Sequence, residues 1–389
     1  IEDMYSGTGL VRWSPYGEPI VPHVARAIDI SEDYREFVFH LRKGMRWSDG
    51  EAFDADDILY YWQYEALEPE AGVHGEPPNY MVTRGEVGTV EKVDTYTVRF
   101  RFNHPNGILL EKLATSEGLR FTSAPEHYRR PYHPVVGDPE LIEQTMKALK
   151  LATPRSVYSR IRGHSNPEHP RIWPWIYRTY RANPPFGYVR NPYYFAVDVE
   201  GNQLPYFDRL VWSLKTADMI PMAVAGGEST IQFEYIGFDN YTLFMEQRKR
   251  NGFDLYHWYN ANASGLLINV NVNRRVDPGD PVTANKHALL NDKTFRQALS
   301  LAIDRRAIIE STQSGQGSPS QAAPGPDSRY YLPELSEAFV SFDPDGAGAK
   351  LDALGLTTRD AEGFRTFADG SRMHFYISLS RPFRACLLY

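Results

Sequence analysis

A short stretch rich in aromatic and amide side chains is where this sequence could most readily hold a ligand. Trp258, Tyr259, Asn260 and Asn262 combine flat apolar faces with amide donors and acceptors. This mixture suits a sugar ring and a peptide backbone equally well, and it makes no covalent bond. We therefore expect reversible ligand contact at these four residues. The alternative is that the asparagines satisfy local turns.

The motifs of the common catalytic sites are absent from the sequence. It contains no HExxH, GxSxG or CxxC motif and no phosphate-binding glycine loop. His164 and His169 lie five residues apart in a proline-containing loop, which is poor spacing for a metal site. Asp343 and Asp345 begin like a calcium loop, but the later glutamate is missing. We expect no catalytic residue, no metal and no cofactor.

Composition excludes several other classes of protein. The 389 residues carry a net charge of −7 without a basic run, which argues against nucleic-acid binding. No apolar run approaches the ~20 residues of a membrane span. A single cysteine, Cys386, rules out a disulfide framework. Aromatic residues make up 13% of the chain, which indicates either core packing or an aromatic-lined cleft. Because Ile1 is not a start residue, we interpret the chain as a mature or truncated piece.

The clearest structural pattern runs from a strand, through a turn, into a helix. Alternating apolar residues predict a half-buried strand over 37–41. A turn built around Ser48-Asp49-Gly50 follows, with Trp47 directly before it. Asp54 is a predicted N-cap, and Asp57 lies three residues on, in the first helical turn.

Similar patterns predict the other elements. We expect a hairpin within residues 87–102 and a strand over 209–214, and helices over 139–151, 241–250, 291–310 and 343–356. Alternation also predicts a strand over 266–273. Trp173 and Trp175 flank a proline, so they either project from a stiff loop or anchor that loop to the protein.

Four of these segments resemble the family 5 extracellular solute-binding proteins of bacterial ABC importers. The first is the strand, SDG turn and Asp-capped helix over 37–67. The second, over 191–212, reads NPYYFAVDVEGNQLPYFDRLVW. The third and fourth, over 291–310 and 343–356, contain RQAL and AIDR, then DPDGAGAKL. All four occur in the order that the family has.

The resemblance implies an α/β, periplasmic-binding-protein-like fold of the class II type, with two lobes and an extra small domain. Residues 1–30 and 189–265 would form a discontinuous domain I, residues 31–188 the extra domain, and residues 266–389 the distal lobe. The strand over 266–273 would cross between lobes. Because family members continue past Tyr389, we expect the C-terminal part of the distal lobe to be missing.

The resemblance also implies a receptor that binds an oligopeptide or an oligosaccharide in an interdomain cleft and delivers it to an ABC permease. It places Tyr5 and Thr8 at the cleft edge, and the protein in the periplasm or outside the cell, with or without a lipid anchor. The complete protein is expected to be a monomer. The high aromatic content and the GNQLPYFD segment favour a sugar ligand, whereas a peptide ligand is favoured because peptide receptors are common in the family. The alternatives are a carbohydrate-active enzyme with an aromatic cleft and a metal-chelate receptor of the same fold.

Overall fold

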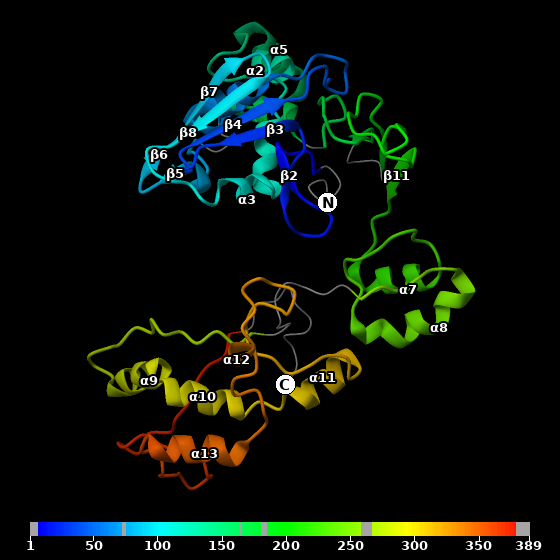
Figure 1. Cartoon of the computed structure of the whole chain (residues 1–389). Coiled ribbons are helices and arrows are strands. Elements are labelled where there is room, and N and C mark those ends of the chain that lie inside the picture. Colours follow the sequence, from blue (N-terminus) through cyan, green and yellow to red (C-terminus); the bar gives the residue numbers. More distant parts are fainter. Residues whose placement is uncertain (1–6, 72–74, 164, 180–184, 258–266, 379–389) are drawn as a thin grey trace. The chain divides into compact units, whose positions relative to one another are not determined.

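The chain folds into two compact units, residues 1–214 (unit 1) and residues 215–389 (unit 2). The structure is a computed structural model, and it describes residues 7–71, 75–163, 165–179, 185–257 and 267–378. Unit 1 carries the sheets and the large hydrophobic core, whereas the named elements in the described part of unit 2 are all helical and are joined by long irregular segments (Figure 1).

Unit 1 is built around a four-stranded antiparallel sheet with the order β3-β4-β8-β7. The strands are β3 (Ala25–Ile30), β4 (Glu36–Leu41), β8 (Thr97–Arg101) and β7 (Thr89–Asp94). Phe37 is paired with Phe100, and Phe39 with Val98. These side chains are fully buried, because alternation along each strand turns them to the same face. The predicted strand and hairpin are confirmed.

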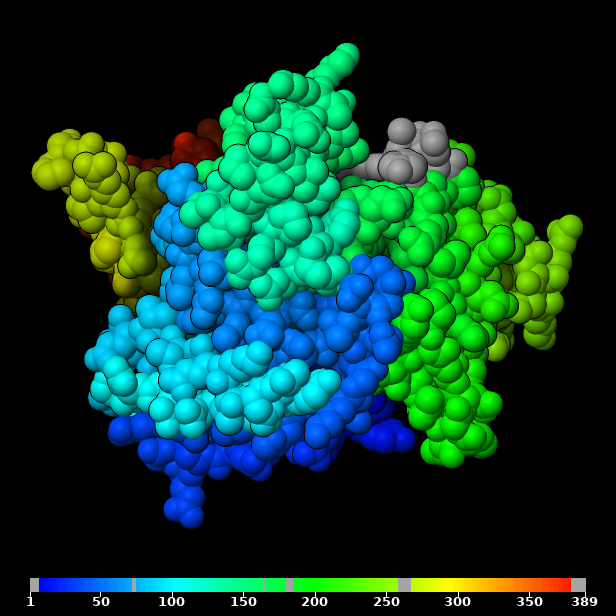
Figure 2. Space-filling view, turned by 90° about the horizontal axis from the view of Figure 1, so that it is seen from above, coloured from blue at the N-terminus to red at the C-terminus, as the bar shows by residue number. Residues whose placement is uncertain are grey.

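The other face of this sheet carries charged cross-strand pairs. Arg101 Nε donates to Glu36 at 2.7 Å, and Arg99 Nη2 donates to Glu91 at 2.8 Å. These side chains are partly exposed, so each pair stabilises unit 1 by less than about 1 kcal/mol. Figure 2 shows the β7–β8 segment, in cyan, at the surface of the molecule.

The predicted Asp-capped helix packs against the apolar face of the sheet. It begins as α2 (Ala55–Tyr60) and continues without a break into a π-helical segment, η1 (Tyr61–Ala66). Asp54 and Asp57 form a reciprocal capping box, in which Asp57 also accepts from the Asp54 N–H at 3.2 Å. The predicted N-cap is therefore confirmed, and the cap fixes the direction in which the helix crosses the sheet.

Smaller elements complete unit 1. Three further sheets are β1 (Val11–Trp13) with β2 (Ile20–Pro22), β5 (Val82–Thr83) with β6 (Glu86–Val87), and β11 (Arg209–Trp212), β10 (Phe186–Arg190) and β9 (Trp175–Tyr177). The helices are α3 (Leu109–Leu113), α4 (Glu126–Arg129), α5 (Pro139–Leu149) and α6 (Pro154–Ile161), with 3₁₀ turns η2 (Pro69–Ala71), η3 (Asn79–Met81), η4 (Ser116–Thr122) and η5 (Arg130–Tyr132).

Unit 2 has nine helical elements within its described residues. These are η6 (Ala217–Met219), α7 (Ile220–Ala225), η7 (Phe238–Asn240), α8 (Tyr241–Asn251), α9 (Pro281–Asn291), α10 (Lys293–Leu301), α11 (Arg305–Gln313), α12 (Pro333–Ser336) and α13 (Pro344–Ala353). Asp292, Asp304 and Asp343 cap α10, α11 and α13. Gly252 ends α8 with a positive φ of 67°. The predicted helices are confirmed.

One predicted element in unit 2 is wrong. The alternating segment 266–273 was expected to be a strand, but its described part, residues 267–273, has no strand. No described strand lies beside this segment to pair with it. A strand without a neighbour would leave its backbone N–H and C=O groups without hydrogen bonds. The proposed division into residues 1–30 with 189–265, residues 31–188 and residues 266–389 stays a prediction.

Unit 2 should exchange its backbone amides faster than unit 1. Its buried apolar cluster comprises Ala298, Leu301 and Ala347, whereas the cluster in unit 1 includes 28 buried residues. Local stability follows buried apolar contacts. Hydrogen–deuterium exchange should therefore show the strongest protection in β4 and β8, and weaker protection in α10 and α13. Equal protection in the two pairs would contradict this expectation.

Candidate functional site

Most of the residues predicted to contact ligand lie outside the described part of the chain. These are Tyr5, Trp258, Tyr259, Asn260 and Asn262. Thr8 is described, and it is fully buried. Its carbonyl oxygen accepts a hydrogen bond of 2.6 Å from Thr122 Oγ1. The role of these six residues in ligand contact stays a prediction.

Thr8 belongs to a polar cluster where the start of the chain meets a segment nearly 190 residues later. Tyr194, in that later segment, has a side-chain hydrogen bond with Thr8 and lies near the guanidinium of Arg12. Burial raises the pKa of the Tyr194 hydroxyl, and the charge of Arg12 opposes the rise. The hydroxyl therefore stays protonated at neutral pH and can donate.

His23 lies beside this cluster, against the residue that follows Tyr194. It follows β2, and its ring centroid lies 5.3 Å from that of Phe195. Its main-chain oxygen accepts from Arg42 Nε at 2.8 Å, and the Arg42 guanidinium lies over the Phe195 ring at 5.7 Å. Burial, then the charges of Arg12 and Arg42, lower the pKa of the His23 imidazole to about 4. His23 is therefore neutral at pH 7.

A second buried polar group lies behind the π-helical turn. The Arg129 Nη1 atom donates to both carboxylate oxygens of Glu65, at 2.7 and 2.9 Å. Tyr158 donates to Glu65 Oε1 at 2.5 Å, and its hydroxyl lies 2.9 Å from that of Tyr60. Burial lowers the pKa of Arg129, but the charge of Glu65, its hydrogen bond and the two neighbouring tyrosines together more than offset this effect, so the pKa is raised. Burial and the Glu65 charge raise the pKa of Tyr158. The guanidinium of Arg129 is therefore charged at neutral pH, and the Tyr158 hydroxyl is protonated and donates.

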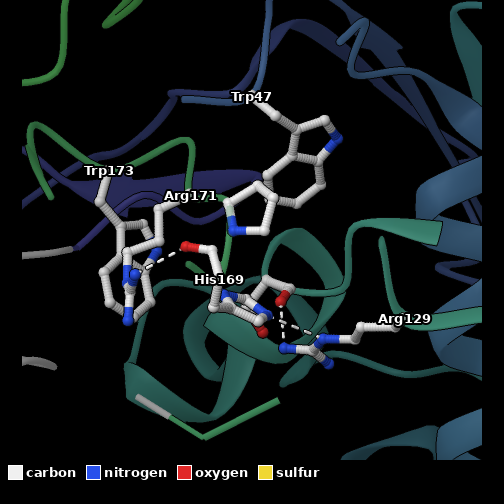
Figure 3. A pocket seen from close by; sticks show the side chains of 7 residues that line it. Trp47, Arg129, His169, Arg171 and Trp173 are labelled. Carbon is white, nitrogen blue, oxygen red and sulfur yellow. Dashed lines mark hydrogen bonds between the residues drawn. The ribbon is translucent and has the colours of Figure 1, made fainter. Parts of the chain in front are cut away.

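A crevice beside this ion pair is lined by Trp47, Ser123, Arg129, His169, Pro170, Arg171 and Trp173. Figure 3 shows the Arg129 and Arg171 side chains converging on His169. Arg129 Nε donates to His169 Nε2 at 3.0 Å, and Arg171 Nη1 donates to the His169 carbonyl at 2.7 Å. The side chains leave no room for a water molecule. The side chains that line the crevice therefore hold their segments together, and the crevice is too small for a sugar or a peptide.

The tryptophans of the 171–177 segment anchor it to the protein. Trp173 and Trp175 are both buried, and Trp175 lies in β9. The Arg171 guanidinium lies 5.4 Å from the centre of the Trp173 ring. Of the two alternatives for these tryptophans, anchoring is therefore the correct one.

Asp57 connects three segments of unit 1. Its Oδ2 accepts from Trp47 Nε1 at 3.1 Å, and its Oδ1 accepts from the Glu126 N–H at 2.9 Å, in addition to the capping-box bond from Asp54. Burial raises the pKa of the Asp57 carboxyl to about 7, against the effect of these three donors. The carboxyl thereby fixes the SDG turn and the start of α4 to the start of α2.

The described residues were compared with the requirements of a metal site and of a membrane span. No group of three or more His, Cys, Asp and Glu residues among them could hold a metal ion. Asp343 accepts from the Gly346 N–H at 2.9 Å as a helix cap. No helix in the described ranges combines the length and apolar character that a membrane span requires.

Sequence reasoning missed the cluster around His23. The NPYYF sequence marks a family segment. Its Phe195 contacts His23, which lies far away in the sequence, and local sequence patterns do not predict such a contact. The adjacent aromatic pair Tyr194-Phe195 is the signal that could have drawn attention to it. Glu65 and Arg129 were missed for the same reason, because they lie 64 residues apart.

Solved structures define the class of the fold. An oligopeptide-binding protein, OppA, superimposes with a TM-score of 0.74 and 32% identity over 94% of this chain and 57% of that one. The periplasmic binding protein MelB from Agrobacterium fabrum C58, in complex with stachyose, gives a TM-score of 0.62 and 25% identity over 95% and 54%. The predicted fold class, the two-lobed α/β fold of periplasmic binding proteins, is confirmed.

Sequence comparison identifies the family. Residues 19–384 match the model of bacterial extracellular solute-binding proteins, family 5 middle, and the chain belongs to that family. It is 28% identical to a periplasmic alpha-galactoside-binding protein from Rhizobium meliloti, over 91% of this chain and 48% of the relative. It is 24% identical to a dipeptide-binding protein from Escherichia coli, over 87% and 55%. The chain thus spans about half the length of these curated relatives.

Proposed function

We propose that this chain is part of a solute-binding receptor that captures an oligosaccharide or an oligopeptide outside the cytoplasm and delivers it to an ABC permease. The observation that carries the proposal is the family match over residues 19–384. The receptor works without a covalent step: ligand held between lobes stabilises the closed form. It is periplasmic or extracellular, free or lipid-anchored, and monomeric when complete.

Two ligand classes have independent support. The alpha-galactoside-binding relative and the stachyose complex of MelB favour a neutral oligosaccharide. The 32% identity to OppA and the similarity to a dipeptide-binding protein favour a peptide. In either case we propose Trp258 and Tyr259 as stacking faces, with Asn260 and Asn262 as hydrogen-bonding groups. Tyr5 and Thr8 complete the proposed set.

A thermal-shift screen should separate the two classes. The protein would be heated with raffinose and stachyose, and with peptides of two to five residues. A ligand present at about 100 times its dissociation constant stabilises the folded state by roughly 2.7 kcal/mol, which gives a measurable rise in melting temperature. We expect a rise with one panel and none with the other.

The variant Trp258→Ala should abolish that rise, whereas Trp13→Ala, in β1, should retain it. No rise with either panel would contradict both ligand proposals. Chromatography would detect any monosaccharide released from raffinose or stachyose. Such release would contradict the binding role and support a carbohydrate-active enzyme.

A further inference from the structure

A buried histidine lies at the contact between residues 8–13 and residues 191–195. The imidazole of His23 is buried and lies against the ring of Phe195. The backbone N–H groups of His23 and Val24 donate to the Leu10 and Gly9 carbonyls at 3.0 and 3.1 Å. His23 therefore joins the N-terminal segment, through its backbone, to the 191–195 segment, through its ring.

Among the described residues, no side chain accepts a hydrogen bond from the ring. Neither Nδ1 nor Nε2 has a hydrogen-bond partner, although the Gly9 backbone approaches the ring and weakly favours its charged form. A neutral imidazole has one N–H donor, but a protonated one has two and a full charge. Burying that charge without an acceptor costs free energy, because the imidazolium loses the hydration that stabilises it in water.

The charges that face the ring oppose protonation as well. Arg12 comes from β1 and Arg42 follows β4, and both are positive. The titratable side chain from the later segment is Tyr194, whose hydroxyl interacts with Thr8 and Arg12 and stays neutral. Within the described residues, no carboxylate contributes to the charge state of His23. Burial and both guanidinium charges therefore disfavour an imidazolium in this contact, and the Gly9 backbone offsets them only in part.

We propose that His23 is an acid-sensitive latch: while its imidazole is neutral it holds residues 8–13 against residues 191–195, and protonation releases them. Opening exposes the ring to water, where the positive charge is solvated and its repulsion by both guanidinium groups is screened. The latch would respond to ambient pH in any compartment that is open to the outside. It does not depend on which ligand the protein binds.

The direction and size of the effect follow from linkage. While residues 8–13 lie against residues 191–195, the pKa of the imidazole is lowered from 6.5 to about 4. This contact therefore loses stability as pH falls from about 6.5 to about 4. The ratio of open to closed forms should rise by up to about tenfold per pH unit in that window, on the order of a hundredfold in total. Above about pH 6.5 the ratio should be constant.

Hydrogen–deuterium exchange of the full chain, analysed by peptide, tests the latch locally. Rates at about pH 7 and about pH 4.5, corrected for the intrinsic pH dependence of exchange, would be compared for residues 8–24 and for β7–β8. We expect residues 8–24 to lose protection on acidification, and β7–β8 to keep it. His23→Phe, which retains an aromatic ring but cannot be protonated, should remove the loss.

Two further variants keep the test decisive if His23→Phe does not fold. Arg12→Gln removes one of the facing charges and should reduce the acid-induced loss of protection. His104→Gln changes a partly exposed histidine whose ring lies 3.5 Å from Glu86, and it should behave as the wild type. Unchanged protection of residues 8–24 in the wild type, or an equal loss in His23→Phe, would overturn the proposal, as would an ordinary pKa for His23 in an NMR titration.

Discussion

Replacing Arg129 with methionine should lower the free energy of unfolding of unit 1 by about 3–5 kcal/mol. The substitution leaves the buried Glu65 carboxylate without the guanidinium that donates to both of its oxygens. Tyr158 remains as one donor, but a hydroxyl does not compensate a full charge. The loss therefore comes mainly from the charge that stays behind.

Urea unfolding followed by tryptophan emission would measure this loss. Six of the seven tryptophans lie within residues 1–214, so the emission reports mainly on unit 1. The matched control is Arg99→Gln, which removes an arginine from the partly exposed pair with Glu91 and should cost less than about 1 kcal/mol. Equal losses in the two variants would show that burial does not set the strength of the Arg129 pair.

The double variant Glu65→Leu/Arg129→Met separates the value of the pair from the cost of breaking it. With neither charge present, the desolvation penalty disappears, and the loss should be smaller than for Arg129→Met alone. A loss equal to the sum of the two single variants would mean that the two side chains act independently, contrary to the contact of Arg129 Nη1 with both Glu65 oxygens.

Local elements were predictable because their signals lie within a few residues. The Asp54 cap, the alternation over 37–41 and the Asp292 cap each needed a window of one or two helical turns, and each is confirmed. The segment 266–273 shows the limit of that reasoning. Its alternation is as regular as that of β4, but a strand also needs a partner, and the described residues provide none.

The candidate site was less predictable than the fold. The π-helical turn that carries Glu65 has no simple sequence signature, although α-helical spacing from Ile58 and Tyr61 does place Glu65 on the buried face. His23 and Asp57 are important because of what surrounds them, Phe195 in one case and Trp47 with Glu126 in the other. Such long-range neighbours follow from packing, which local sequence patterns do not record.

Replacing Asp57 with alanine should lower the free energy of unfolding of unit 1 by roughly 3 kcal/mol, because three N–H donors lose their acceptor together. The indole of Trp47 is fully buried, so water cannot replace the carboxyl there. Asp56→Ala, at the neighbouring position, removes an exposed carboxylate that pairs with Lys92, and should cost less than about 1 kcal/mol. Urea unfolding of the two variants gives the comparison.

The same residue should make stability depend on pH with the opposite sign to His23. Burial raises the pKa of Asp57 from 3.8 to about 7, so its folded-state proton contributes stability that is fully present below about pH 3.8 and is lost as pH rises through about 7. The wild type should therefore lose up to about 1.4 kcal/mol of stability per unit rise in pH through this group within that window, and Asp57→Asn should not.

Because His23 acts in the other direction over nearly the same window, its latch must be followed by local exchange. Unfolding curves of Asp57→Asn at about pH 5 and about pH 7.5 isolate the carboxyl, and a pH dependence identical to that of the wild type would show that Asp57 is ionised throughout.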